Sequence, residues 1–195
     1  MAQRRHHYEQ AFEHYLRSRR MPYVAVDEAK KALLPSGMKL SCLKSFDFMI
    51  YGSKTNLLIE VKGRKVRQGR SGSSGRLESW VTQEDVDSLL AWQGLFGDGF
   101  EAALVFIYWF DSMPQTSLFE EMFVFKDRWY AMRALQVDPY SQAMRVRSPK
   151  WGTVDLSRAD FERLSQRLED LTGLSCESIE QWSLHNSASP VASAP

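Results

Sequence analysis

Apolar residues recur with helical spacing near the start of the sequence. Residues 3–20 are predicted to form an amphipathic helix that ends before Pro22, because five apolar positions follow i, i+3, i+4, i+7 spacing and share one face: Tyr8, Ala11, Phe12, Tyr15 and Leu16. Residues 23–26 (Tyr-Val-Ala-Val) predict a short strand. Residues 28–34 favour a brief helix, which Pro35 would stop.

Two further stretches have strand character, at residues 46–51 and 56–62. The turn residues Gly52-Ser53-Lys54 lie between them, so together they predict a β-hairpin. The second stretch is nearly all apolar in its first half, as expected of a strand inside a sheet. Residues 63–75 are rich in glycine, serine and arginine and predict a flexible loop.

A helix and a strand complete the predicted core. Thr82 precedes a helical segment that runs to about Phe96, with Asp85 where a capping box has its acid. Residues 102–108 give the strongest strand signal in the chain. The order helix, three strands, helix, strand predicts an α/β fold with a mixed sheet flanked by helices. Extra C-terminal elements are predicted as strands at 122–125, 129–135 and 143–146 and as a helix at 156–171, with Ser157 as its capping residue.

Length, composition and charge narrow the class of protein. We expect one domain over residues 1–183 and a disordered, small and polar tail at 184–195. The net charge of +1 argues against a general nucleic-acid coat protein but allows a local basic patch. We expect a cytoplasmic protein without membrane contact, because we find neither a signal peptide nor an apolar stretch of bilayer-spanning length.

Three polar residues on the predicted hairpin carry candidate chemistry. Strand side chains alternate, so Glu60 and Lys62 share one face, while Asp47 lies between two phenylalanines, where burial is costly without a cation. Two converging carboxylates would bind Mg²⁺ or Mn²⁺ and so lower the pKa of a bound water. Lys62 would orient that water or neutralise charge at the attacked phosphorus atom. The pattern indicates phosphodiester hydrolysis, with a surface salt bridge at a strand end as the structural alternative.

This arrangement resembles the PD-(D/E)XK nuclease superfamily. Its restriction-endonuclease-like α-β-β-β-α-β core carries an aspartate on one strand and Glu-x-Lys on the next. The separation of 13 residues between Asp47 and Glu60 is similar to that of the Holliday-junction-resolvase-like branch. That branch also has a glutamate on its first helix, which Glu9 matches, and Glu9 borders the apolar face of the predicted helix. An ordinary first-turn acid is the alternative for Glu9. The segment His7-Tyr8-Glu9-Gln10-Ala11-Phe12-Glu13 further resembles the motif of the uncharacterised bacterial HYExAFE family.

The resemblance implies a metal-dependent DNA endonuclease active in repair, recombination or defence. Asp47, Glu60 and Glu9 would be its metal ligands, within reach of one ion, and Lys62 its catalytic lysine. The other function that we consider is a catalytically inactive module of this fold that binds nucleic acid or a protein partner. Whether the chain forms a homodimer stays open.

Several further residues are candidates for the site or for DNA contact. Gln83 matches a position near the site where some members of the superfamily have a glutamine, with an ordinary helix-start residue as the alternative. Five basic residues follow the hairpin and are predicted to contact the phosphate backbone, with a merely solvated loop as the alternative: Arg64, Lys65, Arg67, Arg70 and Arg76. The tryptophans, including Trp80, Trp92 and Trp109, are expected in the core rather than as platforms for base stacking.

Overall fold

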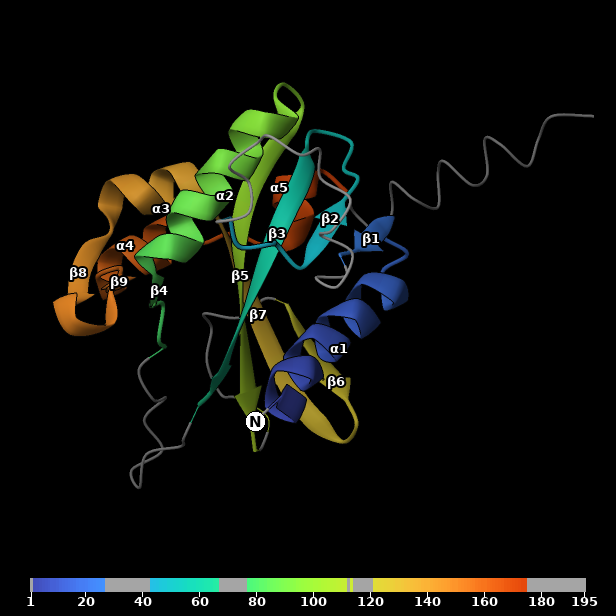
Figure 1. The fold of residues 1–195 in the computed structure, drawn as a ribbon. Helices are drawn as coiled ribbons and strands as arrows, with labels where there is room; N and C mark the ends of the chain where they lie inside the picture. Colours follow the sequence, from blue (N-terminus) through green and yellow to red (C-terminus); the bar gives the residue numbers. More distant parts are fainter. Residues whose placement is uncertain (1, 27–42, 67–76, 112, 114–120, 175–195) are drawn as a thin grey trace, which may run out of the picture.

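A computed structural model describes residues 2–26, 43–66, 77–111, 113 and 121–174 (Figure 1). The first half follows the predicted order of elements, with one two-residue strand added before the second helix. These elements are α1 (Ala2–Ser18), β1 (Tyr23–Ala25), β2 (Phe48–Ile50), β3 (Asn56–Lys65), β4 (Val81–Thr82), α2 (Gln83–Phe96) and β5 (Phe100–Phe110). The predicted helix at 28–34 lies outside the described residues.

The second half extends this core with strands and short helices. Its elements are β6 (Met122–Phe125), β7 (Arg128–Gln136), α3 (Val137–Ala143), β8 (Arg145–Ser148), the 3₁₀ turn η3 (Pro149–Trp151), β9 (Thr153–Asp155), α4 (Arg158–Leu164) and α5 (Leu168–Thr172). Within the described part of the chain, no helix combines the length and apolar character needed to cross a membrane.

Two sheets organise the described residues. The larger sheet has six strands in the order β1-β2-β3-β5-β7-β6, in which β3 and β5 run parallel and the other neighbours antiparallel. The predicted mixed sheet and the β2–β3 hairpin are therefore confirmed. The smaller sheet has the order β4-β9-β8 and lies beside the start of α2 (Figure 1).

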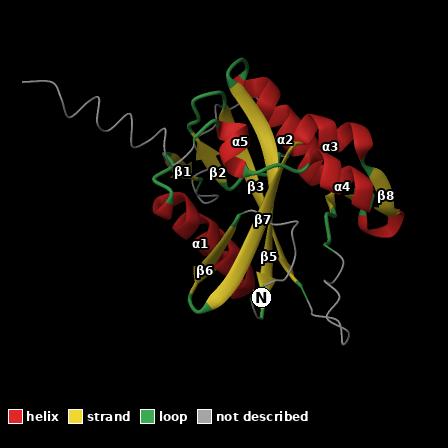
Figure 2. Ribbon diagram, turned by 180° about the vertical axis from the view of Figure 1, so that it is seen from behind, coloured by secondary structure: helices red, strands yellow, loops and turns green. Residues whose placement is uncertain are grey.

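Helices cover both faces of the six-stranded sheet, so the predicted α/β class is confirmed (Figures 1 and 2). One face packs against α2, α3 and α4, through a cluster that includes Leu58, Leu104, Val86, Tyr140 and Phe161. The opposite face packs against α1 and α5, through Leu57, Ile59, Val105, Phe12, Tyr15 and Leu168 among others. Consecutive residues of β3 thus alternate between the two clusters, as the pleat of a strand requires.

Some predicted boundaries were wrong. The hairpin strands cover 48–50 and 56–65, so the predicted loop begins later than residue 63, and residues 67–76 lie outside the described part. The predicted helix at 156–171 is interrupted, because the Gln166 backbone pairs with Ala134 of β7. Ala143 ends helix α3 instead of starting a strand. The strands β4 and β9 and the helix α3 were not predicted at all.

Candidate active site

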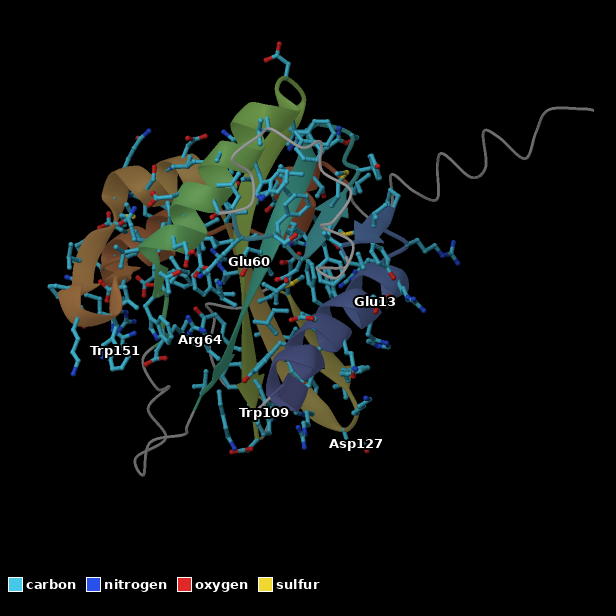
Figure 3. The ribbon with its side chains drawn as sticks, viewed as in Figure 1. Glu13, Glu60, Arg64, Trp109, Asp127 and Trp151 are labelled. Atoms are coloured by element: carbon cyan, nitrogen blue, oxygen red, sulfur yellow. The ribbon has the colours of Figure 1, made fainter. Side chains whose placement is uncertain are left out.

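The β2–β3 hairpin brings Asp47 and Glu60 together. Phe48 is paired with Ile59, so Asp47 and Glu60 stand at the next step along the two strands. Asp47 itself lies in a bend immediately before β2, and its backbone N–H donates to Ile59 O at 2.8 Å. Glu60 occupies the middle of the molecule, between α2 and α1 (Figure 3). The hairpin predicted from the sequence therefore places Asp47 and Glu60 next to each other, as expected.

The Asp47 carboxylate is held in place by a hydrogen bond, and its surroundings disfavour its ionised form. Its Oδ2 atom accepts a hydrogen bond from the backbone N–H of Val61 at 2.7 Å. Burial, followed by the negative charge of Glu60 and then that of Glu9, raises the pKa of Asp47 to about 8, against the opposing effects of the Val61 N–H and Lys62. Three acids are thus close enough to influence one another.

Helix α1 brings Glu9 to this place through a close approach to β3. Tyr8 packs its ring on Gly63, where an added Cβ atom would overlap the ring. Gly63 follows Lys62 on β3 and faces α1, because alternate strand residues face opposite sides. A side chain at residue 63 would push α1, and Glu9 with it, away from the strand. The glycine is therefore a structural requirement for the position of Glu9.

Lys62 is held between two carboxylates. Its Nζ atom lies 2.7 Å from Glu60 Oε1 and 2.9 Å from Asp85 Oδ2. The exposed fraction of the side chain is 11% for Lys62, 14% for Glu60 and 7% for Asp85, so these ion pairs are shielded from water. A shielded, doubly paired ammonium differs from the surface salt bridge that the sequence left as the alternative.

Asp85 is a site residue that sequence reasoning assigned only to helix capping. The capping box with Thr82 is present as predicted, with the Thr82 N–H donating to Asp85 Oδ2 at 3.0 Å. The same carboxylate binds Lys62, and its Oδ1 lies 3.1 Å from Lys44 Nζ. Burial works against the charge of Asp85, but Lys62 and the hydrogen bonds from Thr82 outweigh it and lower the pKa to about 2. The start of α2 thereby positions the lysine.

The structure leaves the other predicted contacts away from this centre or outside its described part. Gln83 donates from Nε2 to the exposed Asp87 at 2.9 Å. Arg64 is 12% exposed, and its guanidinium lies 4.1 Å from the centre of the Trp80 ring. Lys65 pairs with Asp111 at 3.1 Å. The remaining candidates lie outside the described residues: Arg67, Arg70 and Arg76.

The expected close grouping of three carboxylates around one ion is not formed with the side chains as they stand. Among the residues that the structure describes, no three His, Cys, Asp or Glu side chains are arranged to hold a metal ion. The reason is local, since Glu60 is turned to Lys62 and Asp47 to the Val61 N–H. The donor set still fits a hard divalent cation chemically, because burial, then the charges of Glu60 and Glu9, raise the pKa of Asp47, and a bound cation would offset these effects.

Comparisons with known proteins add a likeness among solved structures. No protein-family model matches the chain, and no curated protein sequence matches it. Among solved structures, the Holliday junction resolvase Hjc of the archaeal hyperthermophile Archaeoglobus fulgidus is similar, with a TM-score of 0.49 and 15% sequence identity. That alignment covers 87% of this chain and 95% of the resolvase. The function of the chain is therefore inferred from its own side chains.

Proposed function

We propose that this chain is a metal-dependent nuclease that hydrolyses phosphodiester bonds in DNA. The observation that carries the proposal is the meeting of Asp47 and Glu60 beside the shielded ammonium of Lys62. The negative charges at this place repel one another, since those of Glu60 and Glu9 add to burial in raising the pKa of Asp47. A lone structural ion pair would bring one acid to Lys62, whereas Glu60 and Asp85 both contact this lysine and Asp47 is close enough to feel its charge.

The residues have distinct roles in such a reaction. Asp47, Glu60 and Glu9 would hold Mg²⁺ or Mn²⁺, which supplies a water of lowered pKa and polarises a phosphate oxygen. Lys62 would donate to the phosphate oxygen on which negative charge grows. Asp85 holds the Lys62 ammonium at β3, so that it is oriented before substrate arrives. DNA repair, recombination or defence would use this chemistry.

The proposal is tested by metal-dependent cleavage. The full chain would be incubated with Mg²⁺ or Mn²⁺ and with labelled duplex, single-stranded and branched DNA and with RNA. We expect cleavage that needs the metal and falls by about 10² to 10³ in Asp47→Asn and in Lys62→Ala, because each removes a main electrostatic stabiliser. Glu162→Gln is the control, since Glu162 is 37% exposed and pairs with Arg158 on α4. Cleavage that survives in Asp47→Asn and Lys62→Ala would come from a contaminant.

A second candidate function is a nuclease-fold module that binds nucleic acid or a protein without cutting it. It is favoured by one observation: the carboxylates of Asp47 and Glu60 already have protein partners. Titration calorimetry with Mg²⁺ separates the two functions. Heat of binding that disappears in Asp47→Asn supports the enzyme. If the chain binds no metal and cleaves no substrate, the binding module is supported.

A further inference from the structure

A cavity beside the small sheet has no role in the proposed chemistry. Its volume is about 430 Å³, and it lies between the segment 77–80 and strand β8. The lining residues that matter here are Glu78, Trp80, Arg145, Arg147 and Asp155. The volume falls in the range of small-ligand sites, which is roughly 300 to 1,000 Å³. One nucleotide unit suits a space of this size, and a DNA duplex does not.

Trp80 is an aromatic wall of this cavity. It belongs to neither hydrophobic cluster among the described residues, unlike Trp92 and Trp109, which pack against the two cores as predicted. Its indole N–H donates to Glu78 Oε2 at 3.0 Å, and the guanidinium of the partly buried Arg64 lies 4.1 Å from its ring centre. The ring is thus held in a fixed orientation at the wall of a cavity rather than inside a core.

Arg147 is the more exposed cationic partner of the same ring. Its guanidinium lies 5.2 Å from the Trp80 ring centre, and Nη2 is 3.8 Å from Glu78 Oε1, which is longer than a hydrogen bond. The Arg147 side chain is 41% exposed, compared with 12% for Arg64. Arg147 can therefore leave the ring for a phosphate at small cost, while Arg64 stays in place. Arg145 is committed to Asp155 at 2.9 Å.

The cavity is connected to the candidate active site by strand β3. Glu60, Lys62 and Arg64 are alternate residues of this strand and face the same side. Arg64 is therefore about 7 Å along the strand from Lys62. Figure 3 shows Arg64 between Glu60, at the centre of the molecule, and Trp151, at the edge of the small sheet. A nucleic-acid strand that crosses Lys62 would reach Trp80 and Arg147 next.

We propose that the cavity binds one unpaired nucleotide of the DNA strand next to the cleaved bond, with the base on Trp80 and a phosphate on Arg147. The base must be unpaired, because in a duplex both faces of each base are covered by neighbouring bases. Stacking on an aromatic ring stabilises binding by about 1 to 3 kcal/mol per base, and arginine pairs well with phosphate. This site rests on the proposed nuclease function, and it makes branched or single-stranded DNA the preferred substrate class.

Binding without cleavage tests the site. Fluorescence anisotropy of the full chain in EDTA would compare labelled single-stranded, branched and blunt duplex DNA. We expect Trp80→Ala to weaken binding of the first two about 10- to 100-fold and to leave duplex binding within about twofold. Trp80→Phe keeps an aromatic ring and should retain most of the affinity. Trp151→Ala, which removes an indole that is 72% exposed outside the cavity, should have no effect.

Arg147→Ala gives a second test that does not depend on the folding of the Trp80 variant. Loss of one phosphate contact should lower the slope of log affinity against log salt concentration by about 0.7 for single-stranded DNA. An unchanged slope in Arg147→Ala would overturn the proposal. An equal loss of duplex and single-strand binding in Trp80→Ala would also overturn it, because it would indicate contact with a duplex backbone alone. Absence of any single-strand binding would also overturn it. Because EDTA prevents metal-dependent cleavage, the anisotropy measurements report on the nucleotide site alone. Failure of the nuclease proposal is observed in the cleavage assay with Mg²⁺ or Mn²⁺.

Discussion

At the scale of single residues, the negative charge of Asp47 is costly to the fold, because the carboxylate is buried and lies near the charges of Glu60 and Glu9. Its raised pKa means that the folded protein keeps a proton on this carboxylate at pH values where the unfolded chain has released it. The folded state therefore binds more protons than the unfolded state between about pH 4 and pH 8. In that window, the free energy of unfolding of the metal-free protein should fall as the pH rises.

Asp47→Asn should remove this pH dependence. Asparagine keeps an oxygen for the Val61 N–H but cannot ionise, so the variant should gain stability over wild type as the pH rises from 5 to 8. A difference of 1 kcal/mol corresponds to roughly 2 to 4 °C in Tm for a chain of this size. Thermal unfolding followed by circular dichroism in EDTA measures it. Added Mg²⁺ should stabilise wild type more than the variant, and parallel pH curves would contradict the assignment.

The sequence revealed the acids of the site better than their partners. Asp47, Glu60 and Lys62 lie on one hairpin, where strand alternation and a short turn determine their neighbours. Asp85 was recognised for its local role, since a capping box involves residues three apart, but its contact with Lys62 depends on how α2 packs on β3. Arg64 was placed in a loop because the end of β3 was predicted three residues too early, and its contact with DNA stays a prediction.

At the scale of elements, the contact of α1 with β3 decides where Glu9 lies. Gly63→Ala should push the Tyr8 ring outward and cost about 1 to 3 kcal/mol of stability through overpacking. If Glu9 binds the catalytic metal, displacement by about 1 Å should lower cleavage roughly 100-fold. Urea unfolding and cleavage rates measure the two effects. A variant of normal stability and activity would show that α1 does not depend on this approach.

Gly94→Ala is the matched control for that prediction. Gly94 lies within α2, and an added Cβ atom would meet nothing within 4 Å. Alanine there should stabilise the protein by about 0.5 to 1 kcal/mol, because glycine loses more backbone entropy in a helix. Gly63 lies in a strand under the Tyr8 ring, whereas Gly94 lies on an open face of a helix. The sequence does not show that Gly63 is covered and Gly94 is open, because residues distant in sequence decide both. The interruption of the C-terminal helix by β7 was missed for the same reason.

At the scale of the whole molecule, the C-terminal elements are part of the sheet and of the hydrophobic core. Strand β7 pairs with β5 over eight residue pairs, from Ala103–Gln136 to Phe110–Trp129. Tyr140 and Phe161 belong to the same cluster as Leu58 and Leu104. The helix–strand pattern of the first half was sufficient to predict the α/β class. The sequence did not show that the additions close both faces of the sheet, because residues distant in sequence make those contacts.

Glu121 joins these parts and provides the test of their unity. It is 2% exposed and accepts hydrogen bonds from the Tyr15 hydroxyl of α1 and the Leu168 N–H of α5, both at 3.0 Å. Glu121→Ala would leave both donors without this acceptor, so we expect a loss of about 2 to 4 kcal/mol. Tyr15→Phe removes one of these bonds and should cost about 1 kcal/mol. Urea unfolding followed by tryptophan fluorescence and by far-ultraviolet circular dichroism should give one coincident transition for all three proteins. Two separated transitions in wild type would mean that the C-terminal elements form a unit that unfolds independently of the α1–β5 core.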